Sequence, residues 1–116
     1  MKKGQEYAIL TDEITKAWAG FTTKKYRDFK NLKKENLRDN MTNLELVLNM
    51  LAETSTTELS KKHKPKTFIE NKKIANKGGA VAGNARKDLE QKLGNSVISS
   101  LNAKGLKKQE DNKLDE

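Results

Sequence analysis

Apolar residues recur along this chain at helical spacing, and no stretch alternates between apolar and polar residues as a half-buried strand would. The strongest series follows the i, i+3, i+4, i+7 rule for one helix face and consists of Leu44, Val47, Leu48 and Leu51. Thr42 and Glu45 stand three residues apart at its start, which is the spacing of a capping box. Leu46 and Met50 widen the apolar face beyond one stripe. The pattern therefore predicts a central helix that is flanked on two sides.

Two helices are predicted before this segment. Thr11 is followed by two acidic residues, as an N-cap often is. The apolar positions of the first helix are Ile14, Ala17, Trp18 and Phe21. Gly20 can end that helix, and Thr22 or Thr23 can cap a second, short one. The second helix carries Tyr26 and Phe29 at same-face spacing. We expect the aromatic residues between Trp18 and Phe29 to form one cluster.

A short polar helical segment containing Leu32 and Leu37 is predicted to end near Asn40. After the central helix, residues 61–66 form a charged linker with the only proline of the chain. A helical segment capped by Thr67 follows, with a Gly-Gly pair that interrupts or ends it and Gly94 as its C-terminal residue. The next stretch, "SVISSLN", has adjacent β-branched residues and is predicted to be short and extended.

These segments predict an all-α fold, a small single-domain bundle of about four to five helices with a Gly-interrupted, basic C-terminal helix. The expected boundaries are a domain at 1–104, made of a helical core at 5–60, the linker at 61–66 and a basic helical segment at 67–94, and a polar tail at 105–116. With 116 residues, the chain has room for one small domain.

Charge is concentrated in one third of the chain. The net charge is +8, and residues 59–92 alone carry ten cations against three anions, net +7. A localised excess of this kind can attract a polyanion such as nucleic acid. A Lys-rich face that only contacts solvent explains the same composition equally well, and the pattern leaves both interpretations open.

Several classes of chemistry lack the residues they require. The absence of cysteine excludes disulfides, thiolate metal ligands and Cys nucleophiles. The single histidine, His63, lies between two lysines, so we expect neither a metal site nor a catalytic base there. The longest apolar runs, of three residues, are too short for a transmembrane span. We therefore expect no cofactor, no membrane partner and no catalytic activity.

The stretch "NKKIANKGGAVAGNARKDLE" invites a phosphate-loop interpretation, which its spacing rejects. Gly78 and Gly83 have the separation of a P-loop, but Asn84 and Ala85 stand where that loop needs Lys and Ser or Thr. Two hypotheses remain. Free backbone N–H groups at Gly79 could bind a DNA phosphate beside a lysine, or the small residues could form a smooth helix face for close packing.

With these segments described, a family resemblance can be stated. The residues that carry it are Leu32-Lys33, the run from Leu37 to Thr42, Glu45-Leu46, Lys77-Gly78-Gly79, Ala85-Arg86 and Gly94. From about Glu6 to Asn102 the chain resembles the C-terminal domain of DNA-damage-inducible protein D, and the related bacterial and prophage antirepressor proteins with a BRO-type N-terminal domain. We expect that N-terminal domain to be absent, the chain being a truncated gene product, a lone domain or an excised one.

The resemblance implies a non-catalytic regulatory module of the bacterial cytoplasm that acts in the DNA damage (SOS) response, recombination control or prophage induction. It implies a protein partner in DNA repair or phage regulation and, together with the basic segment, contacts to DNA. The candidate nucleic-acid contacts are Lys72, Lys73, Lys77, Gly78, Gly79, Arg86 and Lys87. The alternative is a structural or homo-oligomerisation domain without nucleic-acid contact, which the broad apolar face from Leu44 to Leu51 would serve.

Overall fold

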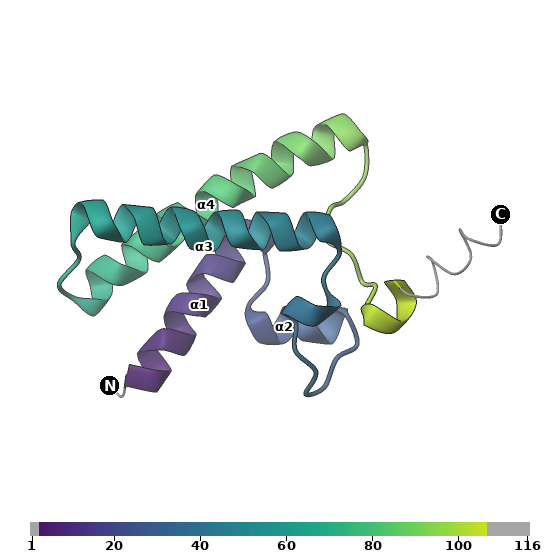
Figure 1. The fold of residues 1–116 in the computed structure, drawn as a ribbon, viewed down its shortest axis with the longest axis horizontal. Coiled ribbons are helices and arrows are strands. Elements are labelled where there is room, and N and C mark those ends of the chain that lie inside the picture. Colours follow the sequence, from purple (N-terminus) through teal and green to yellow (C-terminus); the bar gives the residue numbers. More distant parts are fainter. Residues whose placement is uncertain (1–2, 107–116) are drawn as a thin grey trace.

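The computed structural model describes residues 3–106 and confirms the all-α prediction (Figure 1). Its elements are α1 (Lys3–Ala19), α2 (Thr23–Phe29), the 3-10 helix η1 (Arg38–Asn40), α3 (Asn43–His63) and α4 (Phe68–Leu93). No strand occurs within this range. Most of the predicted polar tail, residues 107–116, lies outside the described residues, and residues 103–106 form a helical turn.

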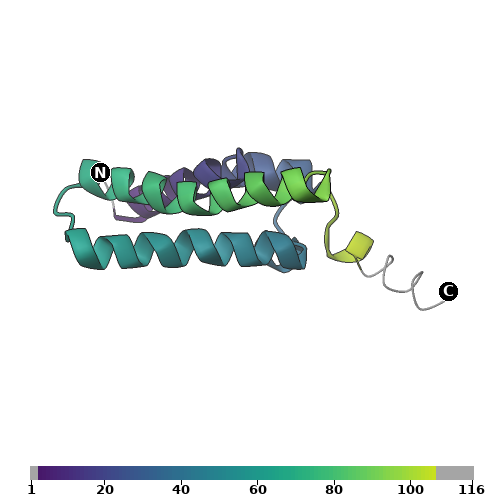
Figure 2. The ribbon, with the colours of Figure 1, turned by 90° about the horizontal axis from the view of Figure 1, so that it is seen from above.

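The helices form two layers in a flat molecule with extents of 55 × 33 × 18 Å. Seen from above, α3 makes one layer, and α1, α2 and α4 make the other (Figure 2). α3 and α4 form an antiparallel hairpin, and α4 crosses α1 (Figure 1). α4 packs against both α1 and α3, so it is the element that holds the bundle together.

Close packing of α4 depends on its glycines, which do not interrupt the helix. α4 is continuous through Gly78 and Gly79, so the predicted interruption is wrong. A Cβ atom at Gly78 would lie 2.6 Å from the backbone of Thr56 in α3, and one at Gly79 would lie 2.6 Å from the carbonyl oxygen of Ile14 in α1. Glycine has a poor helical propensity, but these close contacts are possible only where the helix carries no side chain.

The first helix begins earlier than its sequence signals suggest. α1 already includes Thr11, whose hydroxyl donates to the carbonyl of Tyr7 at 2.9 Å, so the predicted N-cap there is wrong. The neighbouring Asp12 has another role, because its carboxylate accepts from the backbone N–H of Thr23 at 3.0 Å. The predicted stop at Gly20, with φ of +83°, and the N-cap of α2 at Thr22 are confirmed.

The predicted capping box of α3 is present, but the helix turns a different face inward than its apolar pattern indicates. Leu48 is buried with 5% exposure, whereas Leu44, Val47 and Leu51 are exposed. Glu45 and the small Ala52 occupy the inner face, where both are fully buried. This face packs inward because it carries Ala52, a small residue that allows α4 to approach closely.

The segments on either side of α3 are also shorter than predicted. Only the three-residue η1 forms near Asn40, in place of a longer helical segment. At the other end α3 continues to His63 and ends at Lys64, which has a left-handed conformation with φ of +47°. The predicted linker at 61–66 therefore begins too early, because its first three residues extend α3 and only residues 64–67 separate the helices.

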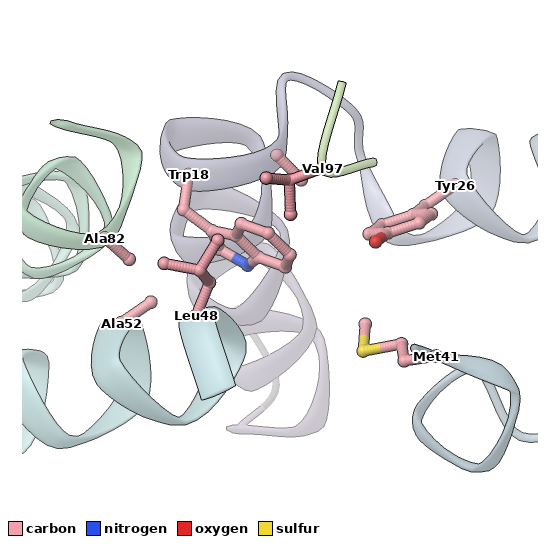
Figure 3. Close-up of a cluster of buried hydrophobic side chains, with 8 residues drawn as sticks. Trp18, Tyr26, Met41, Leu48, Ala52, Ala82 and Val97 are labelled. Carbon is pink, nitrogen blue, oxygen red and sulfur yellow. The ribbon is translucent and has the colours of Figure 1, made fainter. Parts of the chain in front are cut away.

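The core gathers at the end of the bundle where α1, α2 and α3 meet the segment after α4 (Figure 3). The Trp18 indole lies between Leu48 and Val97 in Figure 3. Trp18 and Tyr26 have ring centroids 6.0 Å apart, and Phe21 lies 5.9 Å from Tyr26, so the predicted aromatic cluster is confirmed. Val97 belongs to the predicted extended stretch, which is non-helical and docks this side chain into the core.

Candidate nucleic-acid interface

The end of the α3–α4 hairpin concentrates positive charge. Between residues 58 and 77 the chain carries seven lysines and two glutamates. Both glutamates are engaged: Glu58 lies 3.4 Å from the ammonium of Lys61, and Glu70 accepts from the backbone N–H of Lys66 at 2.7 Å. The charge of the remaining lysines is therefore not balanced locally. We call residues 58–77 the basic end.

Three of the predicted contacts, Lys72, Lys73 and Lys77, lie together on the first half of α4. All three are exposed, and none has a carboxylate within 4.0 Å in residues 3–106. They line a shallow hollow of about 390 Å³ with Glu13, Ile69 and Asn76. Ile69 is 68% exposed there, so the hollow combines an apolar side chain with three lysines and one carboxylate, that of Glu13.

The hollow is anchored between α1 and α4. The amide of Asn76 donates to the carboxylate of Glu13 at 3.0 Å, which fixes the position of α1 beside the lysines. Helical periodicity places Lys87 on the same outward side of α4 as Lys73 and Lys77. It follows Lys77 by ten residues, or about 15 Å along the helix, and it is exposed. Lysine ammonium groups in such a row can contact phosphates without reading base identity.

The remaining predicted contacts have structural roles in the fold. Arg86 donates to the carbonyl of Ala19 at 2.9 Å and lies 3.7 Å from Glu90, and its side chain is only 19% exposed. It joins α4 to the end of α1 and is not free for a phosphate. Gly78 and Gly79 are buried in the middle of α4, where their N–H groups belong to the helix and cannot reach an anion. The close-packing hypothesis for these glycines is thus the one the structure supports.

The structure contains a buried ionic cluster that the sequence did not predict. Lys30, Glu45 and Tyr26 are each 0% exposed. The Lys30 ammonium lies 2.8 Å from Glu45 Oε1 and donates to the carbonyl of Leu101 at 2.7 Å, and the Tyr26 hydroxyl donates to Glu45. Burial, together with the hydrogen bond to Glu45 and its charge, raises the pKa of the Tyr26 phenol.

This cluster holds the fold together and offers no access to a substrate. Glu45 accepts from the backbone N–H groups of Thr42 at 2.9 Å and Ser99 at 3.4 Å, so it ties the start of α3 to the segment after α4. Its sequence signal was the capping box alone, which is typical of an exposed residue. Nothing in the local sequence of Lys30 indicates burial, because its partners are 15 and 71 residues away.

Other kinds of site are not supported in the part of the chain that the structure describes. No group of three or more His, Asp or Glu side chains gathers there as a metal site requires. No helix among residues 3–106 combines the length and the apolar character needed to cross a bilayer.

No protein-family model, curated protein or solved structure significantly matches the chain.

Proposed function

We propose that the protein is a non-catalytic regulatory module that binds the phosphate backbone of nucleic acid through its basic end. The supporting observation is the group formed by Lys72, Lys73 and Lys77, three exposed ammonium groups around one hollow with no carboxylate partner among the described residues. Contacts of this type are strong at low salt and carry no sequence specificity. Lys87 extends the same face of α4.

The sequence resemblance supplies the context of the proposal. A module of the DNA-damage-inducible protein D type would act in the bacterial DNA damage response, recombination control or prophage induction. Its contact with DNA would place a protein partner at a site of repair or phage regulation. Neither the contact with DNA nor the contact with a protein partner requires a cofactor.

The proposal is tested by measuring affinity for a fluorescent DNA duplex and a single strand by anisotropy at ~50 mM salt, where phosphate contacts are strongest. A triple variant, Lys72→Gln with Lys73→Gln and Lys77→Gln, should weaken binding and lower the slope of log K against log salt by roughly one per lost contact. The control changes three exposed lysines elsewhere, Lys24, Lys25 and Lys33, to Gln. Equal losses in both variants, or no binding by the unaltered protein, would refute the proposal.

A second proposed function is self-association through α3, and a specific observation favours it. Leu44, Val47, Met50 and Leu51 are 37–60% exposed on the outer face of α3. From Asn43 to Ala52 the only charged residue is Glu45, which is buried. An uncharged apolar stripe of this kind is typical of a protein contact. In an antiparallel pairing of two copies of α3, the basic ends would point away from each other, which limits charge repulsion.

Sedimentation velocity over a range of concentrations tests this second proposal. The unaltered protein should show a sedimentation coefficient that rises with concentration, and Val47→Asp should remain a monomer. Val81→Asp is the matched control, since Val81 is another exposed valine but lies on α4. A monomer at all concentrations up to the high micromolar range would contradict self-association and leave the DNA proposal unaffected.

A further inference from the structure

A hollow of about 480 Å³ lies between the N-terminal half of α1, the C-terminal half of α3 and the start of α4. It is separate from the hollow at the basic end, since the two share no lining residue. Its volume falls in the range of small-molecule pockets.

Four of the six hydroxyl groups that line this hollow have already used their protons. Each of these four hydroxyls donates to the backbone carbonyl four residues earlier in its own helix, at distances from 2.8 to 3.0 Å. They belong to Thr11, Thr15, Thr56 and Thr57. A hydroxyl that donates in this way still has lone pairs free to accept. Asn71 is similar, because its Nδ2 donates to the carbonyl of Thr67 at 2.9 Å and its Oδ1 remains an acceptor. The hollow therefore presents mainly acceptors.

One carboxylate faces these acceptors and retains capacity for a further donor. Glu53 Oε1 accepts from Asn49 Nδ2 at 2.7 Å and from Arg38 at 3.2 Å, while Oε2 has only the longer contact to Arg38 at 3.4 Å. Because each carboxylate oxygen can accept two hydrogen bonds, Oε2 has a free lone pair. No lysine or arginine lines the hollow, so an anionic ligand would find no cationic partner among the lining residues.

We propose that this hollow binds a primary alkylammonium group. The three N–H donors of such a head match the lone pairs of Glu53 and the threonines. Leu10, Ile14 and Ala75 provide apolar surface for the alkyl chain. Tyr7, at 76% exposure, is the one aromatic residue of the lining, and its ring can attract a cation. The inference does not depend on the proposed contact with nucleic acid.

Isothermal titration with n-butylammonium chloride tests the proposal, with 1-butanol as the neutral probe of equal length. Butylammonium should bind and butanol should bind at least roughly tenfold more weakly, since a charge-assisted hydrogen bond is about twice as strong as a neutral one. Equal binding of the two, or binding of neither, would overturn the proposal. Two further arms identify the source of the group. Tighter binding of 1,4-diaminobutane indicates a free diamine, and tighter binding of N-acetyl-lysine methylamide indicates a lysine of a partner protein.

Three variants distinguish the carboxylate from a general effect on the fold. Glu53→Gln should weaken butylammonium binding roughly tenfold, because it removes the charge that assists the hydrogen bond. Arg38→Gln should strengthen binding, because it removes the competing cation from Glu53. Glu58→Gln is the control, an exposed acid of α3 outside the lining, and should leave binding unchanged. Weaker binding by Arg38→Gln, or an equal loss with Glu58→Gln, would contradict a site built on Glu53.

Discussion

At the scale of single residues, the fold rests on a charge that the solvent does not reach. The carboxylate of Glu45 accepts from Lys30, from Tyr26, from the backbone N–H of its own N-cap residue Thr42 and from the backbone N–H of the distant Ser99. A buried ion pair need not add stability over an apolar substitute, but removing one partner is costly because the other charge is left uncompensated. The cluster therefore specifies how α2, α3 and the segment after α4 fit together.

Tyr26→Phe should change the pH dependence of stability as well as its magnitude. The fold raises the pKa of the Tyr26 phenol, whereas in the unfolded chain it is about 10. Above pH ~10 the unfolded state loses a proton that the folded state keeps, so the stability of the unaltered protein falls with rising pH, by up to about 1.4 kcal/mol per pH unit from this group. Below pH ~10 the contribution is fully present.

The measurement is the free energy of unfolding by urea for both proteins at several pH values. Below pH ~10 the variant should be less stable by about 1–3 kcal/mol, since Glu45 loses a buried donor. Above pH ~10 the difference between the two proteins should shrink. A difference that stays constant from pH 8 to pH 11 would show that the fold does not perturb Tyr26.

At the scale of elements, α4 is positioned by what its glycines lack. Gly78 faces α3, and Gly79 and Gly83 face α1, where a Cβ atom would lie 2.6 Å from the carbonyl oxygen of Ile14 or of Ala17. Backbone atoms of a packed helix cannot move aside as a flexible side chain can. The two contact surfaces of α4 are thus set by three positions within two turns.

Gly79→Ala should therefore destabilise the protein although alanine favours helix. Overpacking against α1 should cost about 1–3 kcal/mol, more than the gain in propensity of about 1 kcal/mol. Gly4→Ala is the matched control, a helical glycine of α1 whose added Cβ atom would have nothing within 4 Å, and it should be neutral or stabilising. Thermal melts of both variants check this, and a stabilised Gly79→Ala would contradict the close approach.

The inward face of α3 is tested by two adjacent substitutions. Leu48→Asp should abolish the cooperative melt, because it places a charge at a position with 5% exposure. Val47→Asp should keep a cooperative transition, since that side chain is 60% exposed. Circular dichroism during heating measures both. A cooperative melt of Leu48→Asp, or the loss of folding in Val47→Asp, would show that the core does not contact the face of α3 that carries Leu48.

The sequence predicted features that depend on neighbouring residues and missed those that depend on distant ones. The caps at Thr22 and Thr42 and the stop at Gly20 follow from local hydrogen bonding and backbone geometry, and all three are confirmed. The buried face of α3 does not follow from local interactions. Leu48 and Val47 are both apolar residues of one helix, and only the packing of other elements decides which of them is buried. Likewise Arg86 was predicted to contact nucleic acid. The sequence does not reveal its acceptor in the fold, the carbonyl of Ala19, because that group is 67 residues away.

At the scale of the whole molecule, charge and apolar surface are segregated. The basic end lies at the α3–α4 turn, the apolar stripe lies on the outer face of the other half of α3, and the core gathers beside that half (Figures 1 and 3). A flat molecule only 18 Å thick can engage different partners at its end and on its face. This separation is what allows the proposed DNA contact and the proposed self-association to be tested independently.

The most direct test of the central claim is to map the DNA contact by NMR. Amide chemical shifts of the protein are followed during titration with a short duplex at low salt. The proposal predicts that the largest changes fall at residues 61–77, with smaller ones near Lys87, and that Lys24 and Lys25 of α2 remain unchanged. Changes centred on α2, or spread evenly over all exposed lysines, would contradict a nucleic-acid site at the basic end.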